Sequence, residues 1–325
     1  MKLLVTGSNG FVGSHIVEHF AKQGHEVYCL VRATSDCKWL ANLKVHCVTG
    51  DISRPETLRD AVKGMDVIVH AAAMLRALTT REYYVVNQHG TRNLAEAALK
   101  FNPSLKHFIH ISSQAAMGPS AELRPKLINE PNTPVSDYGR SKLAGEKELI
   151  SALHGKIPYT ILRPSSVYGP RDKDIFIFFR LVNFGVKLRT LNERFIQLLF
   201  VEDIPIAVER ALSLPVARDK IYCLGENSWN TWAKVAQAIS NSNNLKTHTM
   251  PLPDWVFGAA SFIAEAFAKL TGRPAVLNRQ KITEMRQPYW IADVTPSISE
   301  LGLDFTNLSR GAKITFNWYK ENKWL

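Results

Sequence analysis

Short apolar, β-branched runs that alternate with helix-like segments constrain this chain more than any other feature. The runs occupy residues 2–7, 26–32, 45–51, 66–73, 107–113 and 159–167. Most of the intervening segments have helical periodicity, as with Val12, Ile16 and Phe20 before Gly24. Strands that are apolar on both faces need helices on both sides, because crossover helices must bury their apolar stripes. The pattern predicts an α/β fold with a doubly wound parallel sheet of the Rossmann type.

Beyond residue 172 this alternation falters. Helical spacing at 175–185, a strand and a helix at 194–212, and a further strand at 220–227 follow in turn. The remainder, from Ser228 on, is rich in helical patterns and in tryptophan. We therefore expect a dinucleotide-binding domain of residues 1–170 plus about 201–227, and a smaller, mainly helical substrate domain of residues 171–200 and 228–325.

A glycine-rich loop, "TGSNGFVGSH", joins the first strand to the first helix, with Gly7, Gly10 and Gly13 spaced three apart. Glycine allows a tight turn, a close approach of the backbone to a pyrophosphate, and close packing of the helix on the strand. The helix N-terminus then presents free N–H groups and a partial positive charge to the phosphates. Because a strand precedes the loop and a helix follows it, the loop predicts a bound dinucleotide.

The stretch "SDYGRSKLAGE", residues 136–146, contains a tyrosine four positions before a lysine. Ser136 and Asp137 mark the start of a helix, so Tyr138 and Lys142 share one of its faces. A tyrosine ionises near pH 10, about three units above neutrality, and a nearby ammonium group stabilises its phenolate. The pair predicts an acid/base tyrosine with an electrostatic partner, although this spacing alone also occurs on ordinary surface helices.

The glycine spacing and the tyrosine and lysine after the fifth strand together resemble the extended branch of the short-chain dehydrogenase/reductase superfamily. The resemblance covers the first 170 residues well and the rest loosely. It implies that Ser113, in "HISSQAAMG", hydrogen-bonds the reacting oxygen. Ser112 is the alternative, since only the register with "AAMG" selects Ser113, and both serines could instead cap the strand end. The implied catalytic residues are Ser113, Tyr138 and Lys142.

The same resemblance implies a set of cofactor contacts. Arg32 ends the second strand, where NAD-binding members usually place an acidic residue; its guanidinium suits a 2′-phosphate and favours NADP(H), with NAD(H) or a merely solvated arginine as alternatives. Asp51 resembles the aspartate that meets the adenine amine, and it could also be a turn residue. The implied contacts are Gly7, Asn9, Gly10, Phe11, Val12, Gly13, Arg32, Asp51, Ile52, Ala71, Ala72, Ala73, Asn87, Tyr138, Lys142, Pro164, Ser165 and Val167.

The substrate half favours an apolar ligand. Sugar-nucleotide epimerases and dehydratases of this branch usually carry an arginine where this chain has Ile196 and Gln197, and Arg194 lies two positions too early. Apolar and aromatic runs instead resemble the branch of 3-beta-hydroxysteroid dehydrogenases and dihydroflavonol-reductase-like enzymes, and an apolar substrate needs an apolar pocket. A low-charge segment at 254–270 predicts a buried helix, with a pocket lid or contact with a membrane surface as alternatives.

These features together predict an NADP(H)-preferring oxidoreductase that interconverts a secondary alcohol and a ketone on a hydrophobic small molecule. One rival is an NAD-dependent nucleotide-sugar epimerase or dehydratase. A second rival is a non-catalytic dinucleotide-binding sensor, which would have no use for Ser113, Tyr138 and Lys142 together.

Composition adds bounds on partners and location. Forty Lys and Arg against 29 Asp and Glu give a net charge of +11, but the basic residues are scattered, so we expect a phosphate-bearing ligand and no nucleic acid. The four cysteines lack metal-ligand spacing and predict buried free thiols, and the ten histidines form no ligand cluster, so no metal is expected. The start "MKLLVTG" is too short for a signal peptide, and no apolar run of 18 residues occurs, which favours the cytoplasm. The resemblance implies a homodimer.

Overall fold

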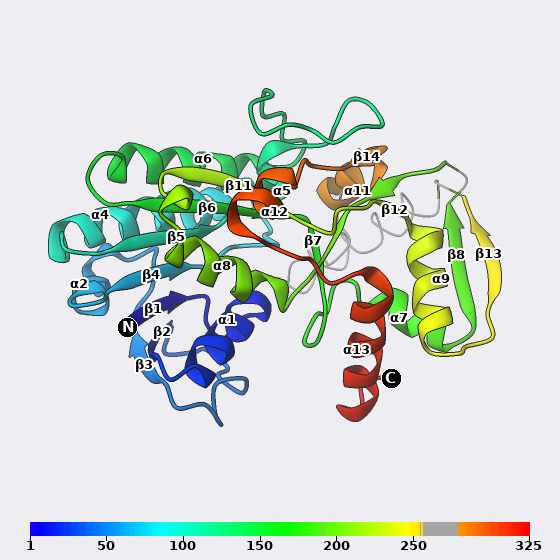
Figure 1. The fold of residues 1–325 in the computed structure, drawn as a ribbon, viewed down its shortest axis with the longest axis horizontal. Coiled ribbons are helices and arrows are strands. Elements are labelled where there is room, and N and C mark those ends of the chain that lie inside the picture. The colour runs from blue at the N-terminus through cyan, green and yellow to red at the C-terminus, as the bar shows by residue number, and fades with distance from the viewer. Residues whose placement is uncertain (191, 254, 256–278) are drawn as a thin grey trace.

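The structure, a computed structural model, describes residues 1–190, 192–253, 255 and 279–325. At its centre lies a seven-stranded, wholly parallel sheet in the order β11-β6-β5-β4-β1-β2-β3 (Figure 1). The strands are β1 (Lys2–Thr6), β2 (Glu26–Val31), β3 (His46–Thr49), β4 (Val67–His70), β5 (His107–Ile111), β6 (Tyr159–Pro164) and β11 (Lys220–Leu224). The predicted Rossmann-type sheet is confirmed, and the run at 220–227 supplies one of its edge strands.

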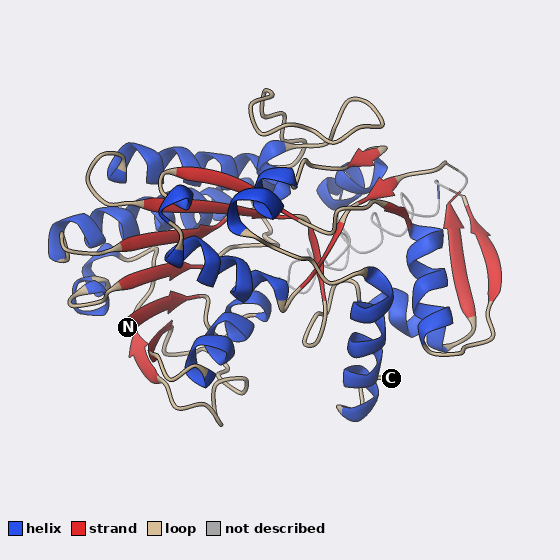
Figure 2. Ribbon diagram, in the orientation of Figure 1, coloured by secondary structure: helices blue, strands red, loops and turns tan. Residues whose placement is uncertain are grey.

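Helices cover both faces of this sheet (Figure 2). Successive residues of a strand point to opposite faces, so β1 contributes to two separate cores. Leu3 and Val5 pack with residues of α1 (Phe11–Lys22) and α8 (Asp203–Ser213). Leu4 packs with residues of α4 (Thr91–Phe101) and α6 (Asp137–Leu153) on the other face.

Shorter elements connect these layers. Before α4 come α3 (Thr80–Tyr84) and one turn of π-helix, η2 (Val85–Gly90), which run on into it. Four more short helices are η1 (Pro55–Thr57), α2 (Arg59–Val62), α5 (Gln114–Met117) and η3 (Pro215–Ala217). The small strands are β7 (Ser166–Tyr168) paired with β10 (Leu198–Phe200), and β9 (Phe195–Ile196) between β12 (Asn230–Thr231) and β14 (Tyr289–Trp290).

A third core lies outside the main sheet. It gathers Phe179, Val182, Ile239 and Phe316, among others, from three helices. These helices are α7 (Phe176–Asn183), α9 (Trp232–Ser242) and α13 (Leu308–Glu321). The strands β8 (Val186–Thr190) and β13 (His248–Leu252) pair beside α9, and α11 (Arg279–Arg286) and α12 (Thr295–Leu301) complete the described elements (Figure 1). The predicted helix at 175–185 is confirmed as α7.

Two expectations need correction. The four cysteines are free, but Cys37, in the segment between β2 and β3, is half-buried. Cys47 is exposed because β3 is an edge strand whose residues are mostly exposed. An edge strand has a neighbour on one side only, so apolar sequence there does not ensure burial. The helix predicted at 254–270 lies outside the described residues except for Trp255, which is exposed. Among the residues described, no helix is long and apolar enough to cross a lipid bilayer.

Candidate functional site

The glycine loop packs directly against the end of β4. Gly7 has a φ of +66°, and a Cβ at this position would lie 2.7 Å from the backbone of Ala72. Only glycine meets both conditions, so this residue sets the distance between the loop and Ala71–Ala73. Asn9 anchors the loop by donating from Nδ2 to the carbonyl of Asp36 at 3.1 Å.

The start of α1 fits an anionic group. Gly10 is the N-cap residue, no side chain caps the helix, and its first turn, which includes Phe11, Val12 and Gly13, contains no acidic residue. Free N–H groups at a helix N-terminus bind phosphate well. The residues present therefore fit the pyrophosphate of a dinucleotide.

The rim of this region holds the residues expected at the adenosine end. Arg32 is exposed at the end of β2, and its backbone N–H donates to Ser35 Oγ at 3.1 Å. Asp51 Oδ1 accepts hydrogen bonds from the N–H and the hydroxyl of Ser53, at 2.9 and 2.7 Å. Ile52 is buried. The exposed guanidinium leaves Arg32 accessible to a ligand, while one carboxylate oxygen of Asp51 already holds its own turn.

Ser113 and Tyr138 meet at the centre of the site. Ser113 follows β5 and is the N-cap of α5, and its hydroxyl hydrogen-bonds that of Tyr138, near the start of α6. The helix approaches closely because residue 139 is glycine, whose added Cβ would lie 2.3 Å from the carbonyl oxygen of Ala115. Both hydroxyl-bearing residues keep some exposed surface. Protein packed around Tyr138 raises the pKa of its phenol, an effect that the Ser113 hydrogen bond partly offsets.

Ser112 is occupied elsewhere. This buried serine donates to Glu146 Oε1 at 2.5 Å, and Glu146 forms a two-pronged ion pair with Arg163 at 2.6 and 2.9 Å. All three side chains are at most 6% exposed. Ser112 therefore belongs to a buried polar cluster between α6 and β6, and of the two serines only Ser113 contacts Tyr138.

Lys142 lies beneath this pair, one turn along α6, and is 1% exposed. Its ammonium group donates to the carbonyl oxygen of Ile111 at 2.9 Å. Burial lowers the pKa of Lys142 to about 8, while Glu146 opposes this shift. A lysine with that pKa is still largely charged at neutral pH.

A buried chain of hydrogen bonds runs under the glycine loop, and sequence analysis missed it. Ala72 N–H donates to Thr6 Oγ1 at 3.2 Å, and Thr6 Oγ1 lies 2.7 Å from His70 Nδ1. On the other side His70 Nε2 lies 3.0 Å from Thr91 Oγ1, which donates to the carbonyl oxygen of Asn87. Since the Thr91 proton is used in that way, His70 must carry its proton on Nε2 and accept at Nδ1. Burial lowers the pKa of His70 to about 3, which keeps it neutral.

The side chain of Asn87 continues this chain toward α6. Its Oδ1 accepts from Met74 N–H at 2.7 Å, and its Nδ2 donates to Ser141 Oγ at 2.9 Å. Ser141 in turn donates to the carbonyl oxygen of Tyr138 at 2.8 Å. We call Thr6, His70, Thr91, Asn87 and Ser141 the polar chain. A histidine inside the apolar run "DVIVHAAA" was the sequence signal for it.

The segment expected beside the nicotinamide spans the end of β6 and β7. Pro164 ends β6, and Val167 lies in β7 opposite Leu199. Between them Ser165 is buried, and its hydroxyl has no hydrogen-bond partner among the described residues. A buried hydroxyl without a partner is rare in proteins, so Ser165 is available to a ligand.

The positions that distinguish sugar-nucleotide enzymes are used internally. Gln197 is buried, with Oε1 accepting from Ala292 N–H at 3.1 Å and Nε2 donating to the carbonyl of Glu226 at 2.9 Å. Ile196 is also buried. Neither residue offers a cation to a diphosphate, and Arg194 lies before them in the chain, in a buried position.

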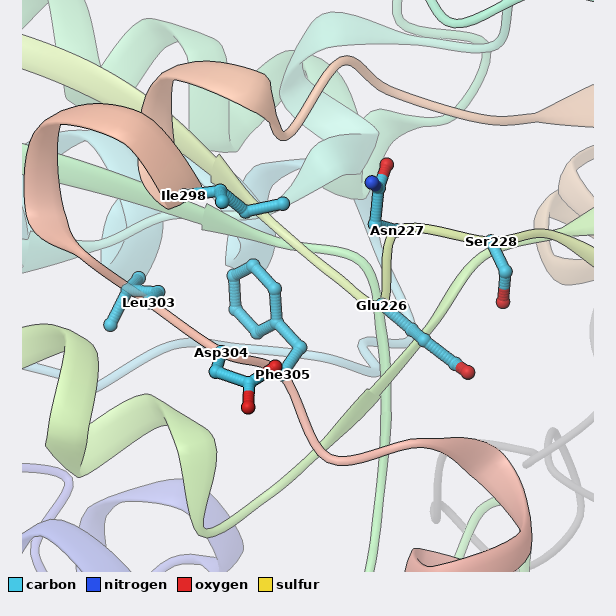
Figure 3. A pocket seen from close by; sticks show the side chains of 7 residues that line it. All are labelled: Glu226, Asn227, Ser228, Ile298, Leu303, Asp304 and Phe305. Carbon is cyan, nitrogen blue, oxygen red and sulfur yellow. The ribbon is translucent and has the colours of Figure 1, made fainter.

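One cavity of about 350 Å³ lies apart from these residues. Figure 3 shows that Glu226, Ile298 and Phe305 are among the side chains around it. None of the predicted site residues lines it, and it contains two carboxylates, Glu226 and Asp304. Among the described residues no cluster of three or more His, Cys, Asp or Glu could hold a metal ion.

Known proteins resemble this chain over most of its length. The model of the NAD dependent epimerase/dehydratase family matches residues 3–224. A ceramide reductase of Caulobacter vibrioides is 29% identical over 322 residues, which cover 99% of this chain and 95% of that protein. A UDP-glucose 4-epimerase of Vibrio cholerae is 28% identical over 293 residues, or 85% and 84% of the two chains.

Solved structures share the fold. A UDP-glucose 4-epimerase of Thermus thermophilus, in complex with NAD, superimposes with a TM-score of 0.78 at 21% identity, covering 98% of this chain and 99% of that one. The family match spans the glycine loop, Ser113, Tyr138 and Lys142. The chain therefore belongs to the NAD dependent epimerase/dehydratase family, and it is an NAD(P)-dependent enzyme of the extended short-chain dehydrogenase/reductase type.

Proposed function

We propose that this enzyme reduces a ketone to a secondary alcohol on a hydrophobic, lipid-like molecule, with NADP(H) as the preferred cofactor. The observation that carries the proposal is the hydrogen-bonded pair of Ser113 and Tyr138 above the buried Lys142. The raised pKa of Tyr138 keeps its phenol protonated, as a proton donor must be.

The residues divide the chemistry among them. A reduced dinucleotide held by the glycine loop would supply the hydride that the carbonyl carbon accepts. Tyr138 gives its proton to the carbonyl oxygen, and Ser113 donates a hydrogen bond to the same oxygen as negative charge develops. The Lys142 ammonium stabilises the resulting phenolate until a solvent proton restores the phenol. Ketone, NADPH and a proton thus give alcohol and NADP⁺.

The same residues fit the cofactor. The first turn of α1 would hold the pyrophosphate, and Ala71–Ala73 would lie along the dinucleotide. Lys142 uses one of its three N–H donors on Ile111 and has no other hydrogen-bond partner in the described part of the chain, so it would also bind ribose hydroxyls.

Arg32 is the basis for the NADP(H) preference. Its exposed guanidinium would pair with the 2′-phosphate, and no acidic side chain ends β2. We expect Arg32→Ala to weaken NADPH binding about tenfold to a hundredfold, the range for a charge-assisted hydrogen bond of roughly 1.5–3 kcal/mol, and to leave NADH binding unchanged. Fluorescence titration measures both, with Arg218→Ala, which removes another exposed arginine, as the matched control. A wild-type preference for NADH would refute the assignment.

The apolar substrate class is supported by the residues where sugar-nucleotide enzymes usually bind diphosphate. Gln197 is committed to Ala292 and Glu226, and Ile196 is buried. Similarity to a ceramide reductase over 99% of this chain points the same way.

Similarity to UDP-glucose 4-epimerases supports one alternative function. In it, the enzyme would epimerise a nucleotide sugar and regenerate a tightly bound NAD in each turnover. Assays with two candidate substrates separate the two functions. One is a long-chain ketone in detergent micelles, and the other is UDP-glucose. We expect NADPH consumption and thermal stabilisation with the ketone only. Epimerisation of UDP-glucose, together with stabilisation by it and none by apolar ketones, would establish the rival instead.

A further inference from the structure

The end of the molecule farthest from the glycine loop has an unusual charge pattern. We call α7, β8, α9 and β13, with their connections in residues 175–190 and 229–253, the basic lobe. This lobe contains no Asp or Glu, although the chain as a whole has 29. Its basic residues are Arg180, Lys187, Arg189, Lys234 and Lys246. Figure 1 shows β8, α9 and β13 together at the end of the long axis opposite the N-terminus.

One face of α7 is apolar and open to solvent. Ile177, Arg180 and Phe184 recur at spacings of three and four, so they share a face of the helix. Ile177 is 40% exposed and Phe184 is 73% exposed. The opposite face is buried through Phe179 and Val182, which belong to the third core.

Neighbouring aromatic residues show that this exposure is particular to the open face. Phe178 stacks on Trp232 with ring centroids 4.3 Å apart, and Phe176 meets Tyr319 edge-on at 4.8 Å. Phe184 has no such ring partner within the residues that the structure describes. Phe176 and Phe178 thus pack against other rings, whereas Phe184 is left exposed.

The chain that leads into β13 contacts the residue that follows this face. The N–H of His248 donates to the carbonyl of Gly185 at 2.7 Å, and a Cβ on Gly185 would lie 3.4 Å from the carbonyl oxygen of Lys246. The backbone of residues 246–248 therefore lies beside Gly185, the residue after Phe184, and both Lys246 and His248 are exposed. We call Ile177, Arg180, Phe184, Lys246 and His248 the tip. Within the described residues, neither Arg180 nor Lys246 takes part in an ion pair.

We propose that the tip docks on the surface of an anionic lipid bilayer. Exposed apolar side chains on a surface that also carries Arg180 and Lys246 gain from both contributions to interfacial binding. These are burial of apolar area among the acyl chains and attraction to anionic headgroups. The absence of carboxylates from the lobe removes the repulsion that such a surface would otherwise impose. A second copy of this chain, itself carrying the same charges at the tip, is a poorer electrostatic match.

Docking here would bring the substrate half of the enzyme to a lipid. Helix α7 begins four residues after Asp172, at the end of the "VYGPRD" segment that follows β6. The docking proposal does not depend on the reaction proposed above, because vesicle binding is measured without substrate or cofactor.

Flotation of the full chain with vesicles tests the proposal. Vesicles of phosphatidylcholine alone are compared with vesicles that also contain phosphatidylglycerol. We expect binding to the anionic vesicles only, weakened by added salt. The double variant Arg180→Glu/Phe184→Ser should bind at least about tenfold more weakly, since about 1.4 kcal/mol corresponds to a factor of ten.

The matched control is Lys63→Glu/Leu123→Ser, which makes the same charge change at exposed positions outside the lobe. It should bind as the wild type does, and both double variants should keep the wild-type melting temperature. Equal loss in the control would mean that net charge alone drives binding and would overturn the proposal. Absence of wild-type binding would also overturn it, as would a dimer that the Arg180→Glu/Phe184→Ser change dissociates, since the tip would then be an interface between copies.

Discussion

The polar chain beneath the glycine loop and the basic lobe at the other end of the molecule differ in how far the protein satisfies its own groups. In the polar chain each donor has an acceptor inside the protein, and His70 is fixed in one tautomer. In the basic lobe, Phe184, Arg180 and Lys246 are exposed. The first region is built to hold a geometry, and the second is built to meet something outside the chain.

Acid should have the largest effect, and it should act through buried histidines on the side of the molecule that contains the polar chain. Burial lowers the pKa of His15 and His107 to about 4 and of His70 to about 3, and that of His110 well below its usual value. All four lie in α1 or in the strands of the main sheet. They stay neutral in the folded state but protonate near pH 6.5 on unfolding, so the unfolded chain binds more protons below that pH.

Stability should therefore be full above about pH 6.5 and fall as the pH drops toward about 4, by on the order of 1.4 kcal/mol per pH unit for each buried imidazole. Urea unfolding at a series of pH values measures this slope. His15→Asn should flatten it by about one imidazole's share. A slope that is unchanged in that variant would show that other groups cause the acid sensitivity.

A pair of glycine substitutions compares the packing of the two regions. Gly7→Ala should lower the free energy of unfolding by roughly 2–5 kcal/mol, because its positive φ and a Cβ 2.7 Å from Ala72 both oppose it. Gly185 in the basic lobe has a similar φ of +81° but no atom closer than 3.4 Å to such a Cβ. Gly185→Ala should cost only about 1–2 kcal/mol. Equal losses in urea unfolding would contradict the view that the glycine loop is the more tightly constrained site.

Much of the first region follows from the sequence, since backbone geometry there admits few residue types. Gly7 must be glycine, and Tyr138 and Lys142 must be four apart to share a helix face. The polar chain was missed because a histidine in an apolar strand does not reveal its partners, Thr6 and Thr91, which come from distant segments. Burial of Cys47 was wrongly expected, since strand order decides which strand lies at the edge.

The region around the third core was harder to predict for a physical reason. Apolar side chains there are compatible with a core, a pocket or an exposed surface, and only packing decides among them. Phe178 and Phe184 look alike in the sequence, yet one stacks on Trp232 and the other is 73% exposed.

Alanine substitutions of the adjacent Ser112 and Ser113 distinguish a structural serine from a catalytic one. Ser113→Ala should lower kcat about a hundredfold, the effect of losing one hydrogen-bond donor to a developing oxyanion. It should also cost about 0.5–2 kcal/mol of stability, because the Ser113 hydroxyl caps α5. Ser112→Ala should instead destabilise the fold by about 1–3 kcal/mol, because it takes a buried hydrogen-bond donor away from Glu146, and should retain most activity. Steady-state kinetics and urea unfolding of both variants are needed. If the effects were exchanged, Ser112 would be the catalytic serine.

The phenol of Tyr138 is the proposed proton donor, and removing its hydroxyl is the most direct test of the proposed reaction. Tyr138→Phe keeps the ring and removes the hydroxyl that meets Ser113. We expect NADPH affinity to change little and the single-turnover rate of ketone reduction to fall by about 10²–10⁴, the usual contribution of a general acid. Tyr222→Phe removes another buried hydroxyl, one that bonds Glu300, and should react at the wild-type rate. An unchanged single-turnover rate in Tyr138→Phe would contradict the assignment of Tyr138 as the proton donor.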